Sequence, residues 1–129
     1  MELGNALNWF EIPVSDFDRA KKFYETIFGF QMPENQMGSA RMGFLLFDFK
    51  SAKVGGAIVH NPAFYTPQPN GSLIYLNCNP DLQKALDKVL QAGGKILEDK
   101  KLIAPDQHLG YWALMIDSEG NRVALHSMQ

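Results

Sequence analysis

The sequence predicts an α+β fold built from two similar halves, each made of one strand, one helix and three further strands. Three observations lead to this prediction. Residues 6–30 combine an alternating strand pattern, an amphipathic helix pattern and a closing glycine. The same order of signals returns about 64 residues later. Each half then continues into three strand-like segments, and because a helix can cover only one face of its half-sheet, the other face is free to form a cup.

The first strand has one aliphatic face and one mixed face. Successive side chains of a strand point to opposite sides, so residues two apart share a face. The aliphatic face suits a core, and the mixed face suits the cup. The two faces carry, in order, Phe10, Ile12 and Val14, and Trp9, Glu11 and Pro13.

A helix is expected from about Asp16. Ser15 stands at an N-cap position with Asp18 three residues later, a short form of the capping box that satisfies backbone donors of the first turn. Apolar residues then recur at spacings of three and four, which is typical of one buried helix face. Gly29 ends the helix, because glycine adopts the positive φ of a helix C-cap without strain. The apolar stripe consists of Phe17, Ala20, Phe23, Tyr24, Ile27 and Phe28.

Adding 64 to these positions gives the second copy. Asn79 replaces the N-cap serine, Pro80 takes the first helical position and Gly93 takes the place of the helix-ending glycine. The repeat predicts a single domain over residues 1–129, with module one at about 6–60, a connector at about 61–71 and module two at about 72–127. The aliphatic strand face becomes Ile74, Leu76 and Cys78. The second helix has its own apolar stripe, which matches the first better at an offset of 65 and consists of Leu82, Ala85, Leu86, Val89 and Leu90.

The remaining segments follow from turn residues and apolar runs. Pro33 and Gly38 limit residues 30–37 to a short or irregular edge strand. Residues 41–49 are apolar enough for a buried strand, in which Asp48 is costly unless it lies near the end. Phe64 and Tyr65 belong to a proline-rich connector, which is either a plain linker or a flap over a pocket. Further strands are expected at residues 54–62, 95–98, 110–116 and 122–127.

Composition excludes several classes of partner. The chain has 129 residues, is 46% hydrophobic and carries a formal charge of −2 from 12 basic and 14 acidic residues. This balance provides no electrostatic footprint for nucleic acid or an anionic membrane. The absence of a long apolar run or a signal-like N-terminus leads us to expect a soluble, unprocessed, cytoplasmic protein. The single cysteine, Cys78, is expected to be a reduced, buried thiol.

Three ordered motifs resemble the vicinal oxygen chelate superfamily, which includes glyoxalase, bleomycin resistance proteins and extradiol dioxygenases. They are the opening WFEIPVSDFDRAKKFYETIFGF, the AGGKIL of the second half and the closing DSEGNRVALHS, and the likeness covers nearly the whole chain. The resemblance implies paired βαβββ modules whose sheets form a cup, and commonly a homodimer. It also implies, in many members, a divalent metal in the cup that acts as a Lewis acid on two neighbouring substrate oxygens.

The ligand positions that the resemblance implies carry no metal donors here. Aligned through Asp16 and the DSEGN turn, these positions fall on Trp9, on Ala124, on Leu73 or Tyr75, and near Ile58. A divalent ion needs about three or four nitrogen, oxygen or sulfur ligands. We therefore predict that the family metal is absent and that no cofactor replaces it.

A rebuilt metal or acid and base site would have to use other residues. Glu11, His60 and His126 are the available donors, with the two histidines treated as counterparts at an offset of 66. The alternative is that both histidines lie near solvent at strand ends and that Glu11 pairs with Arg122. We favour this alternative.

The cup is thus expected to bind a small organic molecule against aromatic walls and a few polar groups. The leading hypothesis is a metal-independent, glyoxalase-like or resistance-type binding protein. A second is a metal-dependent lyase, isomerase or dioxygenase with substituted ligands, and a third is an adaptor acting through its exposed surface. The predicted lining is Trp9, Glu11, Tyr75, Asn77, Arg122 and His126, capped by Phe64 and Tyr65.

Overall fold

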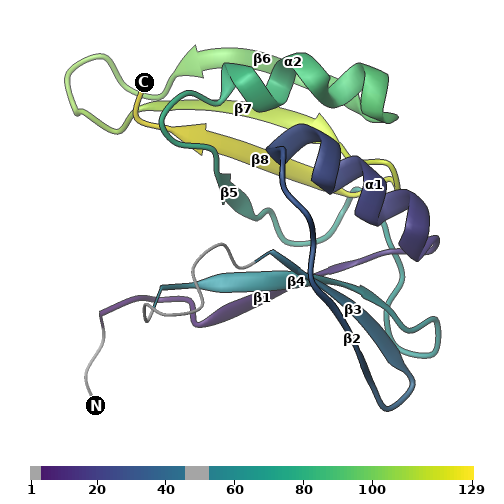
Figure 1. The fold of residues 1–129 in the computed structure, drawn as a ribbon. Coiled ribbons are helices and arrows are strands. Elements are labelled where there is room, and N and C mark those ends of the chain that lie inside the picture. The colour runs from purple at the N-terminus through teal and green to yellow at the C-terminus, as the bar shows by residue number, and fades with distance from the viewer. Residues whose placement is uncertain (1–3, 46–52) are drawn as a thin grey trace.

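The computed structural model describes residues 4–45 and 53–129, and these form two four-stranded sheets and two helices (Figure 1). The first half contains β1 (Trp9–Pro13), α1 (Phe17–Phe28), β2 (Glu34–Met37), β3 (Ala40–Leu45) and β4 (Gly55–His60). The second half contains β5 (Tyr75–Asn77), α2 (Gln83–Ala92), β6 (Lys95–Leu102), β7 (Tyr111–Ile116) and β8 (Arg122–Ser127).

The two sheets share one topology. Their strand orders are β1-β4-β3-β2 and β5-β8-β7-β6. β1 pairs in parallel with β4, and β5 pairs in parallel with β8. The other strand pairs are antiparallel. The predicted α+β fold with two modules of one plan is therefore confirmed. β1 and β5 are edge strands of different sheets, which leaves a seam between the halves.

Several element boundaries differ from the predicted ones. β2 is an exposed edge strand, as expected, but covers only residues 34–37. β3 covers residues 40–45, and the rest of the predicted strand, including Asp48, lies outside the described residues. β6 continues to Leu102, beyond the predicted end at residue 98.

The helix ends were predicted correctly, but their starts were not. Gly29 and Gly93 close the helices with φ of 66° and 106°. The N-cap of α1 is Asp16 rather than Ser15, and the Asp16 side chain accepts a hydrogen bond from Arg19 N at 3.1 Å. α2 begins at Gln83, well after the predicted start, because the Asn79 side chain accepts instead from Met128 N at 2.8 Å.

The aliphatic strand faces and helix stripes form one core. α1 and α2 lie against each other (Figure 1), and their apolar residues pack with the inner faces of both sheets. Phe23 and Tyr24 are fully buried at its centre. Leu90, which the pattern placed in the stripe of α2, is 66% exposed. The apolar spacing therefore assigned this residue to the wrong side of the helix, whereas at an offset of 65 its counterpart is Glu25, on the polar side of α1.

The DSEGN turn, residues 117–121, joins the second module to the start of α1. Glu119 Oε1 accepts hydrogen bonds from Ser15 N at 3.0 Å and Asp16 N at 2.7 Å. The Arg19 guanidinium donates to both Glu119 oxygens, at 2.7 and 3.1 Å. Burial alone would raise the pKa of Glu119, but these donors and the Ser118 hydroxyl lower it to about 2. Glu119, although distant in the sequence, thus provides the negatively charged acceptor that the free backbone amides at the N-terminus of α1 need.

The same turn also contacts β1 and the connector. Asp117, 2% exposed, accepts a hydrogen bond from the Tyr24 hydroxyl at 2.7 Å. Asn121 Nδ2 donates to the Pro13 carbonyl at 2.7 Å, and Asn121 Oδ1 accepts from Gln68 N at 3.1 Å. One turn of the second module therefore fixes a strand, a helix and the connecting segment of the chain.

Candidate functional site

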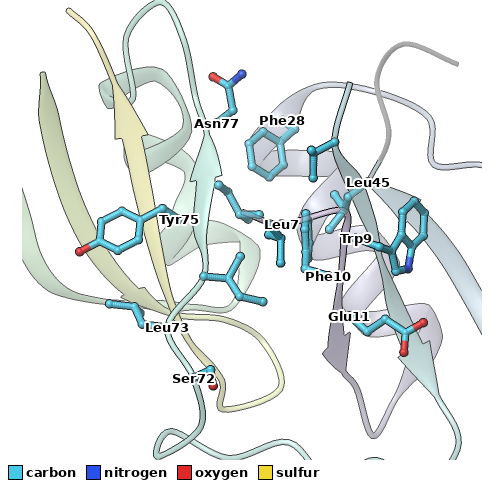
Figure 2. A pocket seen from close by; sticks show the side chains of 13 residues that line it. Leu7, Trp9, Phe10, Glu11, Phe28, Leu45, Ser72, Leu73, Tyr75 and Asn77 are labelled. Carbon is cyan, nitrogen blue, oxygen red and sulfur yellow. The ribbon is translucent and has the colours of Figure 1, made fainter. Parts of the chain in front are cut away.

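A cavity of about 600 Å³ lies at the seam between β1 and β5 (Figure 2). Most of its lining is apolar, and Glu11, Ser72, Tyr75 and Asn77 supply the polar groups. Residues of β1 and of β5 line it, so its walls come from both modules. The remaining lining residues are Leu7, Trp9, Phe10, Phe28, Leu45, Val54, Leu73, Ile74 and Leu76.

Strand alternation places the walls of this cavity. Phe10 stands on the core side of β1, opposite Gly56 of β4. A Cβ atom at Gly56 would lie 2.5 Å from the Phe10 ring, so only glycine lets the ring pack there. Trp9 lies on the other face, 37% exposed, with its indole edge-on to Phe44 at 6.2 Å between ring centroids. In Figure 2 the Trp9 and Tyr75 rings point away from each other, outward from the two walls of the cavity.

Tyr65 of the connector reaches the mixed face of the first sheet. Its side chain is half-buried and packs against Met42, Ala57 and Val59. Its hydroxyl donates to Glu11 Oε1 at 2.5 Å, and this hydrogen bond, together with some burial, raises the pKa of Tyr65. The neighbouring Phe64 is 81% exposed and does not belong to this contact. The structure therefore brings one of the two predicted capping aromatics onto the sheet.

A second, smaller cavity of about 160 Å³ adjoins the first. The two cavities share Glu11, Ser72 and Ile74. Arg122 and Asn121 line the smaller one from the second module. The expected pairing of Glu11 with Arg122 is wrong, because Glu11 is bonded to Tyr65 instead. Within residues 4–45 and 53–129, the Arg122 side chain makes no ion pair or hydrogen bond.

The two histidines lie in different environments. Val14 N donates to Val59 O, and Cys78 N donates to His126 O, so His126 corresponds to Val59 at an offset of 67. The predicted offset of 66 is therefore wrong, and a shift of one residue moves a strand residue to the opposite face. His60 consequently lies on the core-side register of β4, whereas Glu11 lies on the mixed face. His126 Nε2 is bonded to the Leu109 carbonyl at 2.7 Å.

The side chains present do not fit the metal of the family. Three or more His, Cys, Asp or Glu side chains close enough to hold an ion do not occur in the described parts of the chain. Of the positions that the resemblance assigns to metal ligands, Trp9 and Tyr75 lie on the two strands at the seam. Ala124 lies opposite Tyr75 on β8. The counterpart of Ala124 in β4 is Ala57 rather than Ile58, by the same offset of 67. An indole and two methyl groups cannot coordinate a divalent ion.

Cys78 is part of the core. It is 8% exposed, and burial raises the pKa of its thiol to about 12, despite the opposing hydrogen bond to the backbone of His126. This thiol is not a nucleophile at neutral pH.

Sequence reasoning found part of the cavity lining and missed the rest. Trp9, Glu11, Tyr75 and Asn77 were predicted and line the 600 Å³ cavity, whereas His126 lines neither this cavity nor its smaller neighbour. Phe28 was assigned only to the helix core, although its place at the end of the α1 stripe next to Gly29 could have indicated a position at the rim. Leu45 lies in the segment 41–49, for which the apolar sequence allowed a strand facing an apolar pocket, whereas Leu7 carried no signal because its contacts depend on how the two sheets meet.

The described residues form two similar modules with a mostly apolar cavity at the seam between their sheets. Residues 7–43 match the family model described as bleomycin resistance protein-like N-terminal. A glyoxylase-like domain-containing protein of Didymella fabae is 30% identical over 131 residues, covering 97% of this chain and 95% of that protein.

Solved structures show the same fold. A glyoxalase/bleomycin resistance protein from Albidiferax ferrireducens T118 has a TM-score of 0.66 at 19% identity, covering 95% of this chain and 98% of that one. Glyoxalase I from Zea mays has a TM-score of 0.67 at 20% identity, and here 95% of this chain covers 46% of the maize protein. The chain belongs to the glyoxalase and bleomycin resistance family of the vicinal oxygen chelate superfamily.

Among the described residues, neither α1 nor α2 is long and apolar enough to cross a membrane.

Proposed function

We propose that this protein binds a small organic molecule in the 600 Å³ cavity between β1 and β5, without the divalent metal used by many relatives. The observation that carries the proposal is the cavity itself: apolar walls from both modules with a few polar groups at the margin. Cavities of this size and character are typical of small-molecule sites. The absence of coordinating side chains at the inherited ligand positions supports binding rather than metal-assisted chemistry.

Trp9 and Phe10 favour a ligand with a planar or bulky apolar body. Trp9 lies where the resemblance assigns a metal ligand, and its indole offers a stacking surface. Asn77 and Tyr75 supply hydrogen-bonding groups on the β5 side. His126 and Phe64, predicted from sequence as ligand contacts, remain proposals that only a bound ligand will test.

Cavity filling tests the proposal. Leu73→Trp places a large side chain in the lining. Leu97→Trp makes the same change on β6, where Leu97 is 49% exposed and lines neither of the two cavities above nor a third cavity near the start of α2. Compounds from an aromatic fragment library are scored by ligand-observed NMR. We expect binding to the wild type and to Leu97→Trp but not to Leu73→Trp. Equal binding by both variants would show that the compounds bind elsewhere.

Elemental analysis of the purified protein tests the absence of the metal. We expect far less than one divalent ion per chain. About one Zn, Ni, Mn or Fe per chain, lost in Glu11→Ala or His126→Ala, would support instead a lyase, isomerase or dioxygenase with a substituted ligand set. Normal metal content in both variants would identify an ion bound outside these residues.

We also propose that the whole chain acts as one unit and forms a homodimer in the cytoplasm, by analogy with the family. The outer edge strands β2 and β6 give dimerisation a physical motive, since unpaired strand edges favour association. Light scattering after size-exclusion chromatography would give about twice the chain mass of 14.5 kDa.

A further inference from the structure

We propose that the ligand of this site is a zwitterion with an apolar body, whose ammonium group binds Glu11 and whose carboxylate binds Arg122. The inference rests on the proposed function, because it assigns the chemical class of the molecule bound there. The apolar body occupies the 600 Å³ cavity and the charged head occupies the adjoining 160 Å³ cavity.

The two cavities form one bent site. Glu11, Ser72 and Ile74 belong to the linings of both, so a molecule in the larger cavity reaches the smaller one past these side chains. At about 30 Å³ for each water of liquid volume, the smaller cavity holds about five water-sized groups. An ammonium, a carbon and a carboxylate together have about this size. The smaller cavity therefore has room for the charged head group, while the apolar body stays in the larger cavity.

The charges around the site are balanced and come from different modules. Among the described lining residues of the two cavities, Glu11 is the acidic residue and Arg122 the basic residue. The other polar groups of the smaller cavity are neutral, including Thr66, Gln68 and Ser72. Glu11 is half-buried and Arg122 is exposed, so a ligand with one charge alone pairs with one of these residues and leaves the other to water. A ligand with both charges satisfies the two residues together.

Both charged groups retain bonding capacity. Tyr65 donates to Glu11 Oε1 and so orients the carboxylate, whereas Oε2 has no donor in the described part of the chain. Arg122 likewise has no acceptor there, although it lines the same cavity as Glu11. A guanidinium group binds a carboxylate through two parallel hydrogen bonds, and a carboxylate oxygen is a strong acceptor for an ammonium group.

Four probes that share one naphthyl body test the head group. They are 3-(2-naphthyl)alanine, 3-(2-naphthyl)propanoate, 2-(2-naphthyl)ethylamine and 2-(2-naphthyl)ethanol, and dissociation constants are measured by calorimetry or NMR titration. The full-length wild type is compared with Glu11→Gln and Arg122→Gln. Lys88→Gln is the control, because Lys88 lines only the third cavity, near the start of α2. Near-ultraviolet circular dichroism confirms that each variant is folded.

We expect naphthylalanine to bind at least tenfold more tightly than the neutral alcohol. Arg122→Gln should weaken naphthylalanine and the propanoate about tenfold and leave the amine unchanged, which is the size of one lost charge-assisted hydrogen bond. Glu11→Gln should weaken naphthylalanine and the amine and leave the propanoate unchanged. Lys88→Gln should change none of them.

Three results overturn the inference in different ways. If the alcohol binds as tightly as naphthylalanine, or if neither charge substitution matters, the zwitterion assignment is wrong while the small-molecule function stands. If the propanoate or the amine alone binds as tightly as naphthylalanine, only one charge is recognised and the assignment is also wrong. If none of the four probes binds the folded wild type, both this inference and the proposed function fail.

Discussion

Replacing Glu119 by glutamine should weaken the contact between the DSEGN turn and the start of α1. The Glu119 side chain is fully shielded, whereas its partner Arg19 is 53% exposed. Glutamine keeps the shape of the side chain but removes its charge. It therefore weakens the hydrogen bonds from Arg19 and from the backbone amides of Ser15 and Asp16 without opening a cavity.

The pKa of Glu119 sets the magnitude. A lowering from 4.5 to about 2 corresponds to about 3 kcal/mol of stability at neutral pH. Since Arg19 is half-exposed and solvent screens the pair, we reduce this to about 2 kcal/mol. The folded-state pKa is depressed, so this stability is complete above pH 4.5 and is lost as the pH falls from 4.5 toward 2.

Urea unfolding at pH 7 and pH 3 measures the effect. We expect Glu119→Gln to lower the free energy of unfolding by about 2 kcal/mol at pH 7 and by less than half of that at pH 3, since the wild-type carboxylate is then partly neutralised in the unfolded state. Glu98→Gln is the control, because its pair with Lys101 is exposed by 41% and 55% and is worth about 0.5 kcal/mol or less. A difference at pH 7 no larger than the control, or one that does not shrink at pH 3, would refute the reasoning.

Three further predictions concern the core. Tyr24→Phe should lower the free energy of unfolding by about 1 to 3 kcal/mol in urea, because buried Asp117 loses a donor. Cys78 should react with a thiol reagent such as DTNB at pH 8 only after denaturation, since its pKa is about 12, and fast labelling of the native protein would contradict its burial. Gly56→Ala should cost about 1 to 3 kcal/mol by steric overlap with Phe10, and Phe10→Leu in the same chain should recover part of it.

Local signals explain which helix boundaries were predictable. Gly29 and Gly93 end their helices because each adopts positive φ, a property of the residue itself. Ser15 and Asn79 are equally good N-cap residues, yet neither caps its helix. Ser15 N donates to Glu119 Oε1, and Asn79 Oδ1 accepts from Met128 N. Both partners lie far away in the sequence. Long-range partners therefore decided the helix starts.

The candidate site shows the same division. Alternation along β1 correctly separated Trp9 and Glu11 from the core face, because it depends on one strand alone. The equivalence of His60 with His126 required the register between strands, and an error of one residue changed the face. The hydrogen bond from Tyr65 to Glu11 depends on the path of a proline-rich connector, which no periodic pattern specifies.

The DSEGN turn joins the two modules at one end of the seam, next to the smaller cavity. β1 and β5, which face each other across the seam, belong to different sheets. The spacing of the cavity walls is therefore set by this turn together with the core that α1 and α2 share. Under the proposed function, substitutions at residues 117–120, which line neither cavity, can therefore change which ligand sizes fit.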